Sequence, residues 1–219
     1  SFQPHRWRHT CVCCAARGRM GAGGGKGSVF RVNGDVWESW RLVGFGSFGH
    51  VVAVFNTAEK KIYAQKSMSI EKVIQEHQWD LVLREKEILS TLPNLKFVCN
   101  LHFCYKTPTT LHMVLDMLEG GTLMLYMERR KRVAEQGLSE DKARYYLACM
   151  ILALEGLHKH GVVHRDIKDE NVLLDGEGVP HLTDFNVSCI LKEGQCVSDA
   201  VGTLPFMSPE VLEGNPYDF

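Results

Sequence analysis

Short apolar runs separated by glycines mark the first half of this chain. Three of them, Arg41 to Gly44, Val51 to Phe55 and Lys61 to Lys66, are rich in β-branched residues or alternate between apolar and polar positions. This pattern is typical of strands. Two longer apolar runs, Phe97 to Tyr105 and Thr110 to Met117, follow. We therefore predict an antiparallel sheet in this half of the chain.

Helical spacing of apolar residues occurs in two places. The first stretch runs from Trp79 to Leu92 and stops at Pro93, because proline disrupts a helix. The second begins after Ser139, a good N-cap residue, and extends to about His160. Its apolar stripe consists of Ala143, Leu147, Met150, Ile151, Leu154 and Leu157. We expect this helix at the centre of a second, mainly helical lobe.

Composition limits the function classes. The chain has 219 residues, of which 45% are hydrophobic and 23% charged, so it is globular and long enough for one large domain or two lobes. Its formal net charge of -1 gives no indication of a nucleic-acid partner. No apolar run approaches the roughly 20 residues of a membrane span, so we expect no transmembrane segment.

The cysteines outside the N-terminal cluster lie among apolar residues, as buried thiols do. The eight cysteines are Cys11, Cys13, Cys14, Cys99, Cys104, Cys149, Cys189 and Cys196. We interpret them as reduced and expect an intracellular, cytoplasmic protein.

Residues 1–34 have a composition that cannot bury a core, and we interpret them as a flexible leader. The cysteines and histidines near the start offer a metal site as an alternative, but no second cysteine pair at finger spacing follows. If Met20 is the true start, Gly21 would be open to myristoylation, although Gly25 stands where Ser or Thr is usual. An N-terminal lipid anchor is therefore a weak alternative.

Candidate chemistry is concentrated in the run from His164 to Asn171 and in Thr183 to Asn186. Phosphoryl transfer needs an oriented acceptor hydroxyl and neutralised phosphate charge. Asp166 has the chemistry to orient that hydroxyl and accept its proton, and Lys168 to contact the γ-phosphate. Asn171 and Asp184 supply the hard oxygen ligands that suit Mg²⁺. The two runs together predict a phosphoryl-transfer site.

A glycine-rich segment lies between two of the predicted strands. It contains Gly44, Gly46, Ser47 and Gly49. Because the segment does not open a helix, its spacing argues against dinucleotide binding. Glycines would let this hairpin approach phosphates closely, although glycine hairpins are common by themselves.

Lys66 on the following strand strengthens the hypothesis, since a lysine there can reach the α- and β-phosphates. On the first predicted helix Glu85 is the natural ion-pair partner for Lys66, whereas Glu87 must face elsewhere. The alternative is that Lys66 and Glu85 are solvated surface charges. The presence of the loops at 164 and 184 in the same chain argues against this alternative.

With these motifs in this order, the chain resembles a eukaryotic protein kinase from Trp40 to its last residue. Lys168, two positions after Asp166, resembles serine/threonine rather than tyrosine kinases. The resemblance implies ATP and Mg²⁺ as cofactors and protein substrates with serine or threonine hydroxyls. It also implies an α+β fold of two lobes: an antiparallel sheet with one major helix over residues 35–117, and a mainly helical, incomplete lobe over 118–219.

A finer resemblance is to the AGC group and especially the YANK kinases. It rests on Asp184 to Asn186 in place of Asp-Phe-Gly, on Gly202 to Met207, and on Met113 to Leu118. The stretch Val29 to Val36 is also similar to that of YANK kinases.

By the same resemblance, Leu115 to Leu118 is the hinge that contacts adenine. The carbonyl of Asp116 and the amide of Leu118 would face the base. The residues expected to sandwich the ring are Val51, Ala64 and Leu173.

Three departures from the family pattern bear on activity. Asn186 replaces a glycine whose positive φ helps the metal loop turn. Asp199 stands near the usual activation-loop phosphosite, with Ser198 beside it, and we expect Asp199 to pair with Arg165 in partial replacement of a phosphate. From this pairing we predict activity without an activating kinase.

The third departure lies at the end of the chain, which stops at Phe219 before the helices that complete the larger lobe of the family. We expect a truncated chain whose helix from Ser139 to His160 exposes apolar area. The predicted function is ATP-dependent phosphorylation of Ser and Thr hydroxyls on proteins. The alternative is a catalytically impaired nucleotide-binding pseudokinase or interaction fragment.

Overall fold

The computed structural model describes residues 28–46, 49–134 and 137–219. Contacts divide the chain into two compact units. The first unit consists of the residues up to Trp79 together with Leu101–Met117. The second unit consists of Asp80–Asn100 and Leu118–Phe219. The predicted lobe limits at 35–117 and 118–219 stay a prediction. The contacts assign most of the first major helix, Trp79–Thr91, to the second unit.

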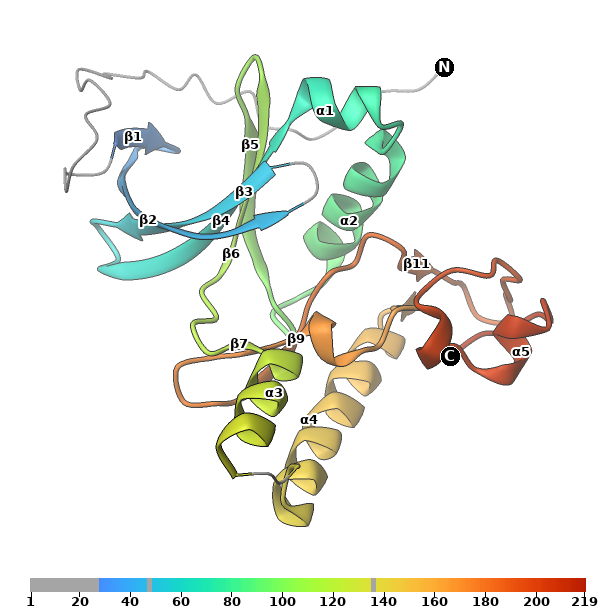
Figure 1. The fold of residues 1–219 in the computed structure, drawn as a ribbon. Coiled ribbons are helices and arrows are strands. Elements are labelled where there is room, and N and C mark those ends of the chain that lie inside the picture. The colour runs from blue at the N-terminus through green and yellow to red at the C-terminus, as the bar shows by residue number, and fades with distance from the viewer. Residues whose placement is uncertain (1–27, 47–48, 135–136) are drawn as a thin grey trace, which may run out of the picture. The chain divides into compact units, whose positions relative to one another are not determined.

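The first unit is built on one six-stranded sheet, shown in Figure 1, in which every pair of neighbouring strands is antiparallel. The order across the sheet is β1-β2-β3-β4-β6-β5. The strands are β1 (Val29–Val32), β2 (Asp35–Gly46), β3 (Gly49–Asn56), β4 (Lys61–Ser69), β5 (Leu101–Lys106) and β6 (Thr110–Asp116). A short helix, α1 (Ile70–Gln75), follows β4. The predicted antiparallel sheet is confirmed.

An aromatic-rich core covers one face of this sheet. Its buried members are Val32, Trp37, Val54, Tyr63, Tyr105 and Val114. Val32 belongs to β1, which pairs with β2 through Val29↔Glu38 to Val32↔Asp35. The expectation of a flexible leader up to residue 34 is therefore wrong from Val29 onward. The prediction for residues 1–27, including the metal-site and lipid-anchor alternatives, lies outside the described residues.

The strand predicted from Phe97 to Tyr105 begins later than expected, at Leu101. Phe97 has a positive φ of 59°, and the Asn100 side chain bonds to backbone groups of Leu95 and Val98, which closes a turn. Val98 instead makes an isolated parallel bridge with Leu182. Local side-chain bonding of Asn100 thus competes with strand pairing at this point.

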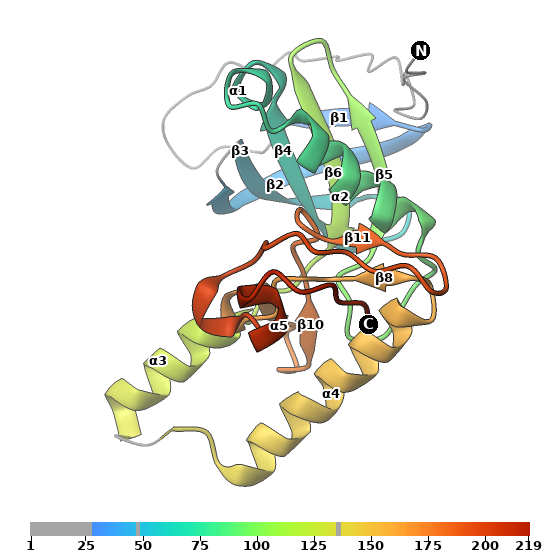
Figure 2. The same cartoon turned by 90° about the vertical axis from the view of Figure 1, so that its right-hand side faces the viewer.

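The second unit is mainly helical, with two small sheets. Its helices are α2 (Trp79–Thr91), α3 (Leu123–Ala134), α4 (Glu140–His158), α5 (Pro209–Leu212) and the 3₁₀ turns η1 (Asp169–Asn171) and η2 (Leu204–Phe206). The first residue of α2, Trp79, is assigned to the first unit. Its strands are β7 (Gly121–Thr122), β8 (Val162–Val163), β9 (Val172–Leu174), β10 (Pro180–Leu182) and β11 (Cys189–Ile190). The sheets have the orders β10-β9-β7 and β11-β8. Figure 2 shows α3 and α4 at one end of this unit.

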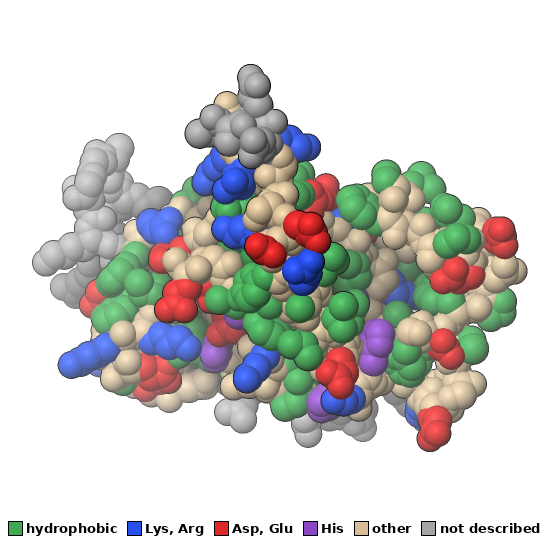
Figure 3. Space-filling view, turned by 90° about the horizontal axis from the view of Figure 1, so that it is seen from below, with side chains coloured by type: hydrophobic (Ala, Val, Ile, Leu, Met, Phe, Trp, Pro, Cys, Tyr) green, Lys and Arg blue, Asp and Glu red, His purple; other side chains and the backbone are tan. Residues whose placement is uncertain are grey.

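The longest helix, α4, begins after Ser139 as predicted, although the Ser139 side chain makes no capping bond. One side of α4 is buried, through Tyr146, Cys149, Ala153 and Leu157. By contrast Leu147 and Ile151 are each 64% exposed, and hydrophobic side chains spread over the centre of the face in Figure 3. The prediction of exposed apolar area on this helix is confirmed.

Two further expectations concern compartment and membrane. Within the described residues the five cysteines are all free thiols, with Cys99 and Cys149 buried and Cys196 exposed. A search of the described helices finds none that is both long and apolar enough to cross a membrane.

Candidate functional site

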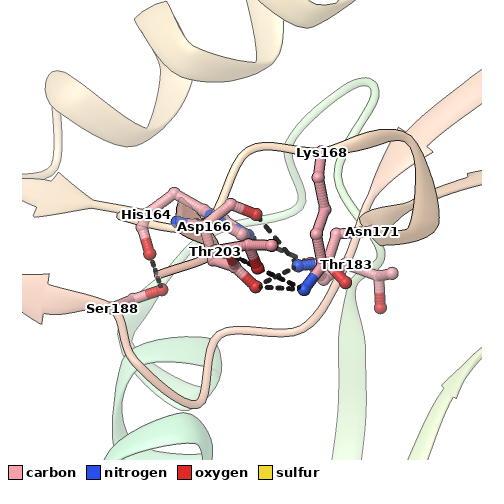
Figure 4. Close-up of polar contacts among 7 residues, drawn as sticks. All are labelled: His164, Asp166, Lys168, Asn171, Thr183, Ser188 and Thr203. Carbon is pink, nitrogen blue, oxygen red and sulfur yellow. Dashed lines mark hydrogen bonds and ion pairs between the residues drawn. The ribbon is translucent and has the colours of Figure 1, made fainter. Parts of the chain in front are cut away.

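The run from His164 to Asn171 forms a loop between β8 and β9 that is fixed by buried hydrogen bonds. The ring of His164 bonds through Nε2 to the carbonyl of Thr183 at 3.0 Å, and it stacks edge-on against Phe185 at 4.9 Å. The hydroxyl of Ser188 donates to the His164 carbonyl at 3.0 Å. Of these contacts, Figure 4 shows the hydrogen bond between Ser188 and the His164 carbonyl. They join the loop to the segment that carries Asp184.

Four polar side chains converge at the centre of this loop (Figure 4). Lys168 Nζ lies 2.8 Å from Asp166 Oδ2, and Asn171 Nδ2 donates to the same oxygen at 2.9 Å. Thr203 Oγ1 donates to Asp166 Oδ1 at 2.7 Å and accepts from Lys168 Nζ at 2.8 Å. Both oxygens of the Asp166 carboxylate are therefore occupied by donors, which fixes its orientation.

These contacts also set the protonation of the cluster. Burial alone would raise the pKa of Asp166, but the hydrogen bonds from Lys168 and Thr203 outweigh burial and hold that pKa below its ordinary value. The bond to Asp166 raises the pKa of Lys168. Burial lowers the pKa of His164, so its ring stays neutral near pH 7. The cluster thus contains a carboxylate and an ammonium, the pair that base and phosphate-contact roles require.

Thr203 was not predicted as a site residue, although the pair Gly202-Thr203 was noted for its resemblance. The chain reaches the cluster because Gly202 has a φ of 115° and lies against the loop. A Cβ on Gly202 would come within 2.4 Å of the Arg165 carbonyl oxygen. Only glycine allows this close approach, and a glycine followed by a hydroxyl residue is the one sequence signal for Thr203.

Arg165 ties the loop to the segment that contains Asp199. Its Nε donates to the Val187 carbonyl at 2.7 Å, and its Nη1 lies 3.2 Å from Asp199 Oδ2. The Arg165 side chain is 2% exposed and that of Asp199 is 67% exposed. Tyr217 holds the same segment, since its hydroxyl donates to the Asp199 carbonyl at 2.8 Å and its backbone pairs with Val197. The predicted pairing of Arg165 with Asp199 is present.

Asn171 and Asp184 fit the role of Mg²⁺ ligands by their chemistry. The Asn171 amide nitrogen donates to Asp166, so its oxygen is the atom that stays available for a cation. Asp184 acts electrostatically on both His164 and Lys168 and so lies near the cluster. No group of three or more His, Cys, Asp or Glu that could hold a metal occurs in the described chain. Two oxygen ligands suffice for Mg²⁺ when phosphate and water complete its coordination.

The positive φ in this region lies at Asp184, with a value of 66°, and Asn186 does not share it. Asn186 therefore does not use the positive φ that the family's glycine offers at this position. Asn186 occupies its position without that strain, because the turn is made two residues earlier.

In the first unit, the sheet register places three predicted residues on one face. Val51 pairs with Lys66, and the next position two residues along β4 is Ala64. Alternate residues of a strand point to the same face, so Val51, Ala64 and Lys66 share it. A lysine and two small or β-branched apolar residues on one face suit a nucleotide with an apolar base and charged phosphates.

The predicted glycines fall into two classes. A Cβ on Gly49 would lie 1.8 Å from the Ser67 carbonyl oxygen, so the packing of β3 on β4 alone requires glycine there. For Gly44 and Gly46 no atom of the described residues lies within 4 Å of such a Cβ, and neither has a positive φ. The fold gives no reason for glycine at these two positions, which favours a role in approaching a ligand. Ser47 lies outside the described residues.

The other predicted residues are distributed over both units. Glu85 is 4% exposed on α2, whereas Glu87 is exposed, as expected for the two positions. A carboxylate so buried requires compensation by a cation or hydrogen bonds, but its pairing with Lys66 stays a prediction. Asp116 ends β6, where its carboxylate bonds to His102 Nε2 at 2.8 Å. Leu118, which is buried, and Leu173, which is half-buried in β9, belong to the second unit.

Comparison with known proteins agrees with this geometry. The profile of the family described as "Protein kinase domain" matches residues 37–219. Serine/threonine-protein kinase 32C of Mus musculus is 36% identical over 193 residues, which cover 86% of this chain and 38% of that protein. Atypical protein kinase C of Drosophila melanogaster is 37% identical over 84% of this chain and 30% of that protein.

A third relative is the RAC family serine/threonine-protein kinase homolog of Dictyostelium discoideum, 37% identical over 83% of this chain and 40% of that protein. The predicted resemblance to AGC-group kinases, with YANK kinases among the relatives, is confirmed. The chain spans less than half the length of these relatives.

Proposed function

The chain belongs to the protein kinase domain family, and on this premise we propose that it transfers the γ-phosphoryl group of ATP to serine and threonine hydroxyls of proteins. The observation that carries the proposal is the closed arrangement of Asp166, Lys168 and Thr203. A deprotonated carboxylate held beside an ammonium is the arrangement that in-line phosphoryl transfer needs.

In the proposed reaction Asp166 accepts a hydrogen bond from the acceptor hydroxyl, orients it and takes its proton. Lys168 contacts the γ-phosphate, whose equatorial oxygens carry the developing negative charge. Thr203 positions both side chains through its single hydroxyl. The low pKa of Asp166 keeps it deprotonated at neutral pH, so the site is ready to accept a proton when the acceptor hydroxyl arrives.

The remaining predicted residues would bind the cofactors. Lys66, paired with Glu85, would hold the α- and β-phosphates, and the hairpin around Gly44 and Gly46 would cover them. Val51, Ala64, Leu173 and the backbone of Asp116 and Leu118 would contact adenine. Asn171 and Asp184 would hold Mg²⁺, which when bound neutralises charge on the phosphate oxygens.

Activity without an activating kinase is part of the proposal. The ion pair of Arg165 with Asp199 and the bond from Tyr217 to the Asp199 backbone already hold the segment before Thr203. A phosphate would offer more charge and one more oxygen than Asp199 does. We therefore expect basal turnover that phosphorylation at Ser198 can raise but does not create.

The test is product identification. The 219-residue chain, expressed in bacteria and treated with phosphatase, is incubated with ATP, Mg²⁺ and a mixture of basic proteins, and the products are analysed by mass spectrometry. Phosphate on serine and threonine, lost when EDTA removes the metal, is the expected result. ATP binding without any phosphorylated product would instead support the impaired-pseudokinase alternative.

A further inference from the structure

Two cations and two phenols meet where α3 contacts α4, on elements that the catalytic cluster does not use. Tyr126 and Arg130 are four residues apart on α3, and Lys142 and Tyr146 are four residues apart on α4. Residues with this spacing share one face of a helix. Lys142 Nζ donates to the Tyr126 hydroxyl at 2.5 Å, so the two pairs face each other across the helix contact.

The aromatic rings fix the position of the Lys142 ammonium. Its Nζ lies 4.7 Å from the centre of the Tyr126 ring and 6.0 Å from that of Tyr146. The two rings meet at right angles, with centroids 6.3 Å apart. Cation–π contacts and the hydrogen bond therefore hold a positive charge in one place on this surface.

Two polar atoms of the cluster are buried without a hydrogen-bond partner. They are the Tyr146 hydroxyl and Nε of Arg130, and the Tyr146 residue is only 3% exposed. Buried polar groups in folded proteins are nearly always hydrogen-bonded. Lys142 acts on the Tyr146 hydroxyl and Arg130 on the Tyr126 hydroxyl, but neither orphaned donor meets an acceptor at hydrogen-bond distance among the described residues. The acceptor that both donors need therefore comes from outside the described residues.

The cations of the cluster also have no ion-pair partner among the described residues. Among the described ion pairs none includes Arg130 or Lys142. The nearby acids are used elsewhere, since Glu140 bonds to Arg144 at 2.7 Å and Glu128 lies 4.0 Å from Arg132.

Exposed basic residues on α3 need no ligand to explain them. Lys131 and Arg132 lie in the last turn of α3, where the helix dipole favours cations. The dipole does not explain Arg130 on α3 or Lys142 on α4, which have no ion-pair partner among the described residues.

We propose that Arg130, Lys142 and Tyr146 form a binding site for a phosphate-type dianion. A phosphate has enough acceptor oxygens to take bonds from the guanidinium, the ammonium and the Tyr146 hydroxyl at once. The field of the site already favours a negative oxygen, because the hydrogen bond from Lys142, assisted by Arg130, lowers the pKa of Tyr126. The two orphaned atoms are buried, which favours a small anion over a flat membrane surface.

The test uses isothermal titration of the full 219-residue chain with inorganic phosphate at constant ionic strength, with chloride as the reference salt. Binding with a dissociation constant on the order of 1 mM is expected. Arg130→Gln and Lys142→Gln should each weaken the affinity at least about tenfold. Arg132→Gln, which removes an exposed cation from the same helix, is the matched control and should leave the affinity unchanged.

Tyr146→Phe is the variant that separates ligand binding from folding. It removes only the orphaned hydroxyl, so thermal stability without phosphate should stay the same or rise, while phosphate affinity falls about three- to tenfold. Equal phosphate affinity in wild type, Arg130→Gln and Tyr146→Phe would overturn the proposal. Loss of binding to phosphatidylserine vesicles in Arg130→Gln, with no measurable phosphate binding by the wild type, would overturn it in favour of a membrane contact.

Discussion

Replacing Thr203 by valine removes one hydroxyl and almost no volume, and we expect it to damage the catalytic cluster selectively. The hydroxyl donates to Asp166 at 2.7 Å and accepts from Lys168 at 2.8 Å. A hydrogen bond to a charged group contributes about 1.5–3 kcal/mol, but the direct contact between Lys168 and Asp166 at 2.8 Å stays in place. We therefore expect kcat/KM for protein phosphorylation to fall about 10- to 100-fold in Thr203→Val.

The pH dependence gives this prediction a second, independent readout. Asp166 works as a carboxylate, and the Thr203 bond helps to keep its pKa low. Without that bond the pKa rises, so the acid limb of the activity profile should move to higher pH. Thr203→Ser, which keeps the oxygen, should retain most of the activity, and circular dichroism should report the same fold for both variants. An unchanged acid limb together with wild-type kcat/KM in Thr203→Val would refute the reasoning.

Three further predictions address the first unit and the activation segment. Gly49→Ala should lower stability by about 1–3 kcal/mol, because the added Cβ would lie 1.8 Å from the Ser67 carbonyl oxygen. Gly46→Ala should change stability by no more than about 0.5 kcal/mol but weaken ATP binding. Equal melting temperatures of the two variants would contradict the steric argument. Burial lowers the pKa of His112 from 6.5 to about 4, so the stability that the neutral ring provides is present above pH 6.5 and is lost as pH falls toward 4, by up to about 3 kcal/mol. Urea unfolding of His112→Gln should show a smaller loss of stability over this pH range than the wild type does. An identical pH dependence in the two proteins would disprove the assignment of this loss to His112. Asp199→Ala should reduce turnover of the dephosphorylated chain by up to about fivefold, since an ion pair whose carboxylate is exposed contributes about 0.2–1 kcal/mol; turnover that appears only after phosphorylation at Ser198 would count against the pairing.

The catalytic loop was predictable because its residues are contiguous and chemically distinctive. Asp166, Lys168 and Asn171 lie within six positions, and the structure brings their side chains together. Thr203 joins the same cluster from 37 residues away. A lone threonine carries no sequence signal for a contact at that separation, and only the neighbouring Gly202 pointed to a close approach.

The edges of the sheet were harder to predict than its centre. The strand Val29–Val32 was not predicted, because the glycine-rich composition before residue 28 indicated a flexible leader. The strand is stabilised by Val32, which is buried in the aromatic core with Trp37. Tertiary packing of that kind overrides local composition. The backbone of the metal loop was likewise not predictable, because the positive φ falls on Asp184 and not on residue 186.

Phosphoryl transfer by Asp166→Ala, compared with the wild-type chain, tests the central claim most directly. Radiolabelled ATP and a serine- and threonine-containing protein substrate report the transfer, and equilibrium binding of a fluorescent ATP analogue reports nucleotide affinity in the same preparations. Removing a general base typically costs about 10²–10⁴ in rate, so the variant should bind the nucleotide normally and transfer phosphate at least about 100-fold more slowly. Equal transfer by the two proteins, with equal nucleotide binding, would contradict the assignment of Asp166 and of the enzyme site built around it.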